Sequence, residues 1–178
     1  MITRLTETKG IDLVTNIIDE LLSENIQFVI LGSGEKKYED FFSDLTKKYP
    51  NMKAFIKFDR AMSKKIYASS DIFLMPSKSE PCGLAQMIAC SYGTIPIVRS
   101  VGGLADTIIP YGKSEKANGL SFDNFNAHEL LYTVKEALKV YSDKEKWIKL
   151  THNAINSDFS WNTSAKEYIS IYNDLLKW

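Results

Sequence analysis

The stretch DIFLMPSKSEPCGLAQMIACSYGTIPIV, residues 71–98, decides the fold class. It begins with the continuous apolar run DIFLMP, crosses a polar loop into a helical pattern over residues 83–92, and ends in a second apolar run, IPIV. Short apolar strands separated by a helix are typical of a parallel sheet that is buried on both faces. The stretch therefore predicts a strand–helix–strand unit of an α/β protein.

The same alternation precedes this unit. Strand-like runs occupy residues 1–5, 27–31 and 52–58, and helical patterns occupy 10–25, 37–50 and 61–70. This order predicts a Rossmann-like, doubly wound parallel sheet with helices on both faces. Three further helical segments follow at 127–141, 143–155 and 162–178. Because no linker, repeat or low-complexity tract interrupts the chain, we expect one domain over residues 1–178.

Composition excludes several functional classes. The 178 residues include 22 basic and 22 acidic side chains, so no basic excess points to a nucleic-acid or membrane partner. Two cysteines and two histidines do not form a zinc spacing, and we expect no metal and a reducing, intracellular setting. No apolar run approaches the roughly 20 residues of a membrane span. The first residues, MITRLTETKG, lack the apolar core of a signal peptide.

The loops after the strands are the expected ligand site, because open α/β sheets bind ligands beyond the carboxyl ends of their strands. In the loop 77–83, Gly83 opens a helix whose first N–H groups have no internal partner and so attract phosphates. Glu80 would then lie just ahead of a phosphate and face sugar hydroxyls. The alternative is a plain acid at a helix N-terminus, which is the more common role for that position.

Other strand ends carry candidate side chains. Arg4 and Lys9 lie at the end of the first strand and could neutralise phosphates; the alternative is that both are solvated surface charges. Phe58 ends the third run and is placed either to stack on a base or to join the core. The segment LGSGE at 31–35 lacks the third glycine of a dinucleotide loop, and a tight strand-to-helix turn explains it equally well.

The segment GGLAD at residues 102–106 adds two glycines. The backbone of Gly102 and Gly103 can approach a ligand closely, with Asp106 as an anchor of the loop. A simple turn is the alternative interpretation.

Several motifs together resemble a known family. TRLTETKGIDLV, LGSGE, YASSDIFLMPSKSEPCGLAQMIACSYGTIPIVRSVGGLADT and FSW resemble, in order and spacing, the C-terminal half of bacterial glycogen synthases and plant starch synthases. The resemblance runs from Ile2 to about Trp161. It implies the C-terminal half of a GT-B fold and a retaining glucosyltransferase without metal or cofactor. Such an enzyme transfers glucose from ADP-glucose or UDP-glucose to the non-reducing end of an α-1,4-glucan.

The resemblance also implies roles for residues at matching positions. Arg4 and Lys9 would bind the diphosphate, and Glu80 would contact the donor glucose and be required for catalysis. The N–H groups of Gly83, Leu84 and Ala85 would meet phosphate, with Cys82 beside them in EPCGL, and Phe58 would stack on the base. The family usually has threonine at position 85 and often tyrosine at 58. Many related transferases carry a second glutamate at position 88, where this chain has Ile88, as the glycogen and starch branch does.

The family's N-terminal domain, with its KxGGL loop, a catalytic histidine and most of the acceptor groove, has no counterpart in these residues. We therefore interpret the chain as a cytoplasmic (or, in a plant, plastid) nucleotide-sugar-binding domain that is inactive alone and meets the α-glucan through that missing domain. A non-catalytic nucleotide-sugar sensor and another GT-B transferase are the alternatives. The aromatic residues of the last helical pattern belong either to the core or to a patch facing the missing domain: Trp161, Tyr168, Tyr172 and Trp178.

Overall fold

A computed structural model describes residues 1–177 and confirms the alternation of strands and helices. The strands are β1 (Phe28–Gly32), β2 (Met52–Ile56), β3 (Ile72–Met75), β4 (Ile95–Arg99) and β5 (Leu120–Phe122). The helices of the first half are the 3-10 turn η1 (Glu7–Lys9), α1 (Ile11–Ser23), α2 (Lys36–Lys48), α3 (Arg60–Ser69) and α4 (Ala85–Ser91). The second half contributes α5 (Gly103–Thr107), α6 (Ala127–Ser142), α7 (Lys144–Ile155) and α8 (Trp161–Leu175).

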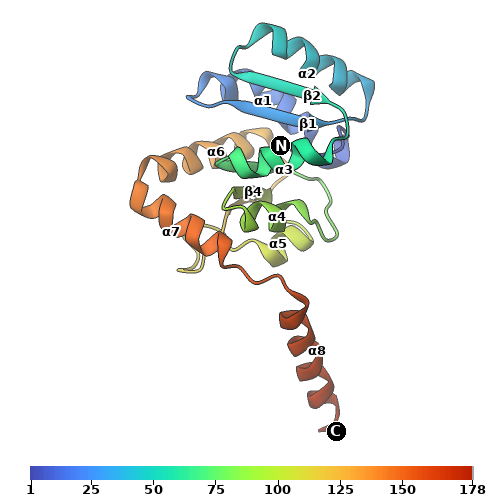
Figure 1. Ribbon diagram of the computed structural model, residues 1–178, viewed down its shortest axis with the longest axis vertical. Coiled ribbons are helices and arrows are strands. Elements are labelled where there is room, and N and C mark those ends of the chain that lie inside the picture. Colours follow the sequence, from blue (N-terminus) through green and yellow to red (C-terminus); the bar gives the residue numbers. More distant parts are fainter. Residues whose placement is uncertain (178) are drawn as a thin grey trace.

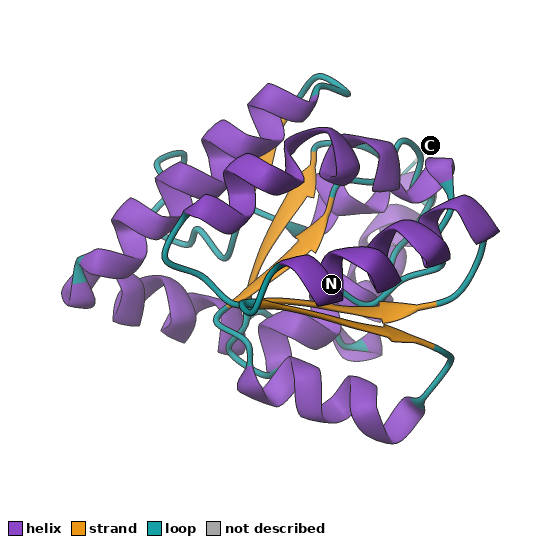
Figure 2. Ribbon diagram, turned by 90° about the horizontal axis from the view of Figure 1, so that it is seen from above, coloured by secondary structure: helices purple, strands orange, loops and turns teal. Residues whose placement is uncertain are grey.

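All strand pairs are parallel, which confirms the predicted α/β class. β1 pairs with β2, while β3, β4 and β5 form a second sheet in that order. Figure 2 shows the two groups of strands at an angle to each other, with helices on both sides. The predicted single sheet is thus divided into two.

The predicted first strand, residues 1–5, is irregular. It makes only isolated parallel bridges, Ile2 to Leu31 and Leu5 to Gly34. The carbonyl oxygen of Thr3 would lie 1.8 Å from a Cβ placed at Gly32, so the segment presses closely on the end of β1. This segment brings residues 1–4 alongside the end of β3, where a hollow forms between them.

The core follows the apolar spacing of the sequence. Seven apolar residues of the predicted first helix are buried in α1, namely Ile11, Leu13, Val14, Ile17, Ile18, Leu21 and Leu22. They join a cluster that continues through the strands into α6 and α7. Asp59, Asn126 and Asp143 accept backbone N–H bonds at the starts of α3, α6 and α7, which fixes where these helices begin.

Helix α8 departs from this pattern. It extends away from the body of the molecule in Figure 1, and none of its residues is buried. The core interpretation is therefore wrong for Trp161, Tyr168 and Tyr172, which are exposed. Trp178 lies outside the described residues. Within residues 1–177, no helix combines the length and the apolar character that crossing a membrane requires.

Candidate functional site

Two loops from distant parts of the sequence are joined at the carboxyl ends of the strands. The backbone N–H of Lys78 donates to the carbonyl oxygen of Thr8 at 2.9 Å, and the Lys78 ammonium lies 3.0 Å from the Glu7 carboxylate. Gly10 makes the approach feasible, because a Cβ there would lie 2.0 Å from the carbonyl oxygen of Pro76. Gly10 also has φ +70°, a left-handed conformation that favours glycine.

A hollow of about 370 Å³ opens between these loops. Six predicted site residues line it, namely Arg4, Lys9, Glu80, Gly83, Leu84 and Ala85. The rest of its lining comes from Met1, Ile2, Thr3, Leu74, Met75 and Ser77. The structure thus places two cations, one carboxylate and the start of α4 around a single opening, while their contact with a ligand stays a prediction.

One oxygen of the Glu80 carboxylate at this opening is held by two neighbouring side chains. Glu80 Oε2 lies 2.6 Å from Lys9 Nζ and accepts a hydrogen bond from Ser77 Oγ at 3.1 Å. Glu80 is only 9% exposed, and α4 starts five residues later, at Ala85. The interpretation of Glu80 as a solvated acid at a helix N-terminus is therefore wrong, and so is that of Lys9 as a free surface charge.

The backbone before α4 offers donors to the hollow. The N–H groups of Gly83, Leu84 and Ala85 have no acceptor among residues 1–177. The helix itself begins at Ala85 and not, as the sequence predicts, at Gly83, so the glycine belongs to the loop. Donors without partners at the start of a helix favour an anionic ligand.

Gln86 fixes this loop, a role that the sequence analysis missed. Its side chain is fully buried, and Nε2 donates to the carbonyl oxygens of Cys82 at 3.3 Å and Gly83 at 3.0 Å. The same nitrogen lies 3.1 Å from Thr107 Oγ1 in α5. The available signal was a polar residue on the otherwise apolar face of a short helix.

Gly102 and Gly103 pack closely against the backbone of the loop that precedes α4. A Cβ at Gly102 would lie 2.3 Å from the carbonyl oxygen of Glu80, and one at Gly103 would lie 2.0 Å from that of Cys82. The N–H of Gly103 also donates to the Glu80 carbonyl at 3.1 Å. Neither glycine lines the hollow, and neither does the exposed Cys82. The geometry favours a structural role for the glycine pair, and ligand contact stays a prediction for all three.

Arg99, at the end of β4, was also missed. Its guanidinium donates to the carbonyl oxygens of Ser77 at 2.9 Å, Lys78 at 2.5 Å and Asp123 at 3.3 Å. The guanidinium carbon also lies 5.7 Å from the centre of the Phe125 ring. A charged residue that ends the apolar strand IPIVR was the signal. Arg99 therefore positions the loop that carries Glu80.

Phe58 lies outside the hollow, in the loop between β2 and α3. Its ring is 85% exposed, so the core interpretation is wrong. Stacking on a base stays a prediction, and the exposed ring has a π-face free to make it.

The two cysteines differ in environment. Cys82 is exposed, whereas Cys90 is buried, and burial raises the pKa of its thiol to about 12. Within residues 1–177, no three His, Cys, Asp or Glu side chains come together in a way that could hold a metal ion. The expectation of a metal-free site stays a prediction.

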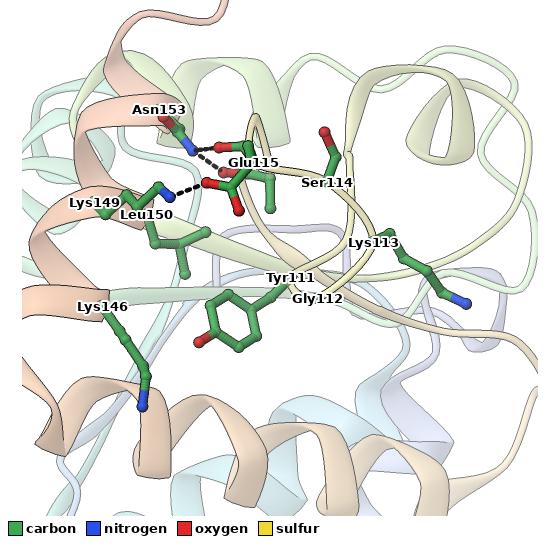
Figure 3. Close-up of a pocket in the computed structure, with 10 residues that line it drawn as sticks. Tyr111, Gly112, Lys113, Ser114, Glu115, Lys146, Lys149, Leu150 and Asn153 are labelled. Carbon is green, nitrogen blue, oxygen red and sulfur yellow. Dashed lines mark hydrogen bonds and ion pairs between the residues drawn. The ribbon is translucent and has the colours of Figure 1, made fainter.

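A second hollow, of about 510 Å³, lies between residues 111–117 and α7 (Figure 3). Here the polar groups hold the loop to the helix. Lys149 forms an ion pair with Glu115, and Asn153 Nδ2 donates to the carbonyl oxygens of Glu115 at 2.8 Å and Ala117 at 2.9 Å. Lys146 pairs with Asp143. The hollow lined by Glu80 also offers backbone N–H groups without acceptors among residues 1–177, so it is the better candidate site.

Known proteins similar to this chain indicate its family. The sequence profile of the family described as "Glycosyl transferases group 1" matches residues 1–154. A glycogen synthase of Clostridium botulinum (strain Alaska E43 / Type E3) is 54% identical over 177 residues, covering 98% of this chain and 37% of the relative. A glycogen synthase of Geobacillus thermodenitrificans is 48% identical over 179 residues, covering 99% and 37%. The chain thus spans little more than a third of the length of these relatives.

Solved structures of glycosyltransferases are also similar to this chain. The catalytic domain of starch synthase IV from Arabidopsis thaliana, bound to ADP and acarbose, is similar with a TM-score of 0.87 and 36% identity. That match covers 97% of this chain and 37% of the plant chain. Sucrose-phosphate synthase from Thermosynechococcus elongatus gives a TM-score of 0.70 at 21% identity, over 98% and 44% of the two chains, which is a likeness of fold alone.

Proposed function

The chain belongs to the group 1 glycosyl transferases, and from this premise we propose that it is the donor-binding domain of a retaining glucosyltransferase. In the proposed reaction a longer protein transfers glucose from ADP-glucose or UDP-glucose to the non-reducing end of an α-1,4-glucan, with no metal or cofactor. The observation that carries this proposal is the single hollow that brings Arg4, Lys9 and Glu80 together. The 54% identity to a glycogen synthase supports the choice of substrate class.

The proposed donor lies with its diphosphate between the cations and the start of α4. Arg4 offers a forked pair of N–H donors to phosphate oxygens. The Lys9 ammonium has three donors, so its bond to Glu80 leaves two for the diphosphate. The free N–H groups of Gly83, Leu84 and Ala85 face the same anion. In this arrangement the Glu80 carboxylate faces the attached glucose.

The nucleotide base extends from the diphosphate toward Phe58 in this proposal. The ring is exposed, so it offers an aromatic face without prior rearrangement. The Arabidopsis starch synthase IV neighbour is a complex with ADP, which supports a nucleoside diphosphate as the ligand.

The acceptor glucan is bound, in this proposal, by the part of the longer protein that these residues do not include. Transfer of glucose requires donor and acceptor to be held together in a closed cleft from which water is excluded. The exposed apolar residues of α8 would pack against that part. We also propose that the protein acts in the cytoplasm, with neither membrane nor nucleic acid as partner.

Calorimetric titration of the 178-residue chain with ADP and with UDP tests the proposal. We expect binding of at least one nucleotide, and Lys9→Ala to weaken it by about 1.5–3 kcal/mol, because a charge-assisted hydrogen bond to phosphate is lost. Lys64→Ala, at an exposed position of α3 outside the hollow, serves as the matched control and should leave the affinity unchanged. No heat with either nucleotide at millimolar concentration would contradict the proposed function.

A further inference from the structure

We propose that Ser77 is a positioning residue for Glu80. Together with Lys9 it holds one oxygen of the carboxylate, so that the other oxygen is presented to the sugar of the donor. This inference rests on the proposed function, because it concerns how the same hollow distinguishes a nucleotide sugar from the nucleotide alone.

The two oxygens of Glu80 have different surroundings. Oε2 receives both contacts, from Lys9 Nζ at 2.6 Å and from Ser77 Oγ at 3.1 Å. Oε1 accepts no hydrogen bond from residues 1–177, and it is not among the buried side-chain oxygens that lack a partner. Solvent therefore reaches Oε1. Since Glu80 is otherwise buried and lines the hollow, this oxygen is the one that a ligand meets.

The Ser77 hydroxyl is a fixed donor. The residue is 2% exposed, and its carbonyl oxygen accepts a hydrogen bond from Arg99 Nε at 2.9 Å. The next residue, Lys78, is tied through its backbone N–H to Thr8. Both contacts hold the peptide unit that follows Ser77, so the hydroxyl moves chiefly by rotation about χ1, and the bond to Glu80 selects one rotamer.

Lys9 cannot replace this hydroxyl. An ammonium on a flexible four-carbon stem attracts the carboxylate as a point charge but fixes its rotation poorly. In the proposed donor complex Lys9 also binds phosphate, so its hold on Glu80 is shared. The hydroxyl of Ser77 has no second partner among residues 1–177, and it keeps Oε2 in place when the diphosphate enters.

Titration of the 178-residue chain with a nucleoside diphosphate and with its glucose derivative tests this role. Ser77→Ala should weaken ADP-glucose, or UDP-glucose if that donor binds better, by about 5- to 10-fold, the effect of one lost hydrogen bond. The affinity for the matching ADP or UDP should change by less than about 2-fold, because the diphosphate does not contact the lost hydroxyl. Ser79→Ala, two residues away and exposed, is the matched control and should change neither affinity.

Two further variants separate positioning from folding. Ser77→Thr retains the hydroxyl and should restore the affinity for the nucleotide sugar. Ser77→Cys fills the space that alanine leaves with a slightly larger side chain that is a weak donor, so it should lose nucleotide-sugar affinity as Ser77→Ala does, without leaving a void. In a Glu80→Ala background, Ser77→Ala should have no further effect on nucleotide-sugar affinity, because the oxygen that it positions is gone.

Equal losses of affinity for the nucleotide and the nucleotide sugar would overturn the inference, since a merely structural serine would affect both. So would an unchanged nucleotide-sugar affinity in Ser77→Ala, with nucleotide binding intact in the unmodified chain. Failure of the unmodified chain to bind ADP, UDP and their glucose derivatives would overturn the proposed function and this inference with it.

Discussion

Helices α6 and α8 have nearly the same length, 16 and 15 residues, and both carry apolar side chains at helical spacing. The two helices differ in how much of their surface is buried. Seven residues of α6 are buried, and the helix packs against α1, β5 and α7. No residue of α8 is buried, and the helix leads away from the body of the molecule (Figure 1).

The difference shows what an amphipathic pattern can and cannot indicate. The pattern states that one face of a helix is suited to burial, but the surface that covers it lies elsewhere in the chain or in another part of a longer protein. For α6 that surface is within these residues. For α8 we propose that it belongs to the remainder of the longer transferase, since the chain spans 37% of the length of a related glycogen synthase.

The largest expected effect comes from truncating one apolar side chain in each helix. Leu130→Ala in α6 should lower the free energy of unfolding by about 3 kcal/mol, because a fully buried side chain leaves a cavity. Ile169→Ala in α8 removes an exposed side chain and should change it by less than about 0.5 kcal/mol. Urea unfolding followed by circular dichroism measures both. Similar losses in the two variants would mean that α8 is covered in solution.

The residues that precede the first turns of α6 and α8 should also differ in their contribution to stability, by a smaller amount. Asn126 Oδ1 accepts from the backbone N–H groups of His128 at 2.9 Å and Glu129 at 3.1 Å, so Asn126→Ala should cost about 1 kcal/mol of folding free energy. Ser160 occupies the same position before α8 but makes no capping bond, and Ser160→Ala should cost less than Asn126→Ala. The same unfolding experiment compares the two. A larger loss at Ser160 would reverse the expected order.

The smallest expected effect is a pH dependence of local stability in the first turn of α8. Hydrogen bonds from Thr163 and Ser160 lower the pKa of Asp158 to about 2. A carboxylate whose pKa is lowered on folding stabilises the structure above its usual pKa near 4 and loses that effect as the pH falls toward 2. The protection factor of the Thr163 amide, which is its exchange rate by NMR relative to that of an unfolded chain at the same pH, should therefore decrease below pH 4. Asp158→Asn should remove this pH dependence. If the Thr163 amide of that variant still responded to pH in the same way, a group other than Asp158 would be responsible.

Much of the fold could be predicted because apolar spacing is a local property. The buried face of α1 and the parallel strands follow directly from it. β5 was missed because three residues, LSF, are too few to show a period. α5 was missed because the glycine pair at its start is equally typical of a turn. The division of the sheet follows from the irregular first segment, which no spacing indicates.

The site was predicted in part. Arg4, Lys9 and Glu80, which strand-end position and the family resemblance indicate, line one opening in the structure, and their contact with a ligand stays a prediction. The sequence could not show that Lys9 and Glu80, 71 residues apart, bind each other. A polar residue in an apolar helix and a charge at a strand end mark Gln86 and Arg99 as unusual, but the sequence could not show that they bind backbone carbonyl oxygens of the loop before α4.

The joined loops at the opening have a thermodynamic consequence. Thr8 and Lys78 are linked through the backbone, and Glu7 is linked to Lys78 through side chains, so the walls on which Lys9 and Glu80 stand are restrained before any ligand arrives. Association then freezes few additional rotamers, and little of the attraction is cancelled by lost conformational entropy. The hollow is therefore preorganised, and its selectivity depends on the positions that Lys9 and Glu80 occupy before a ligand binds.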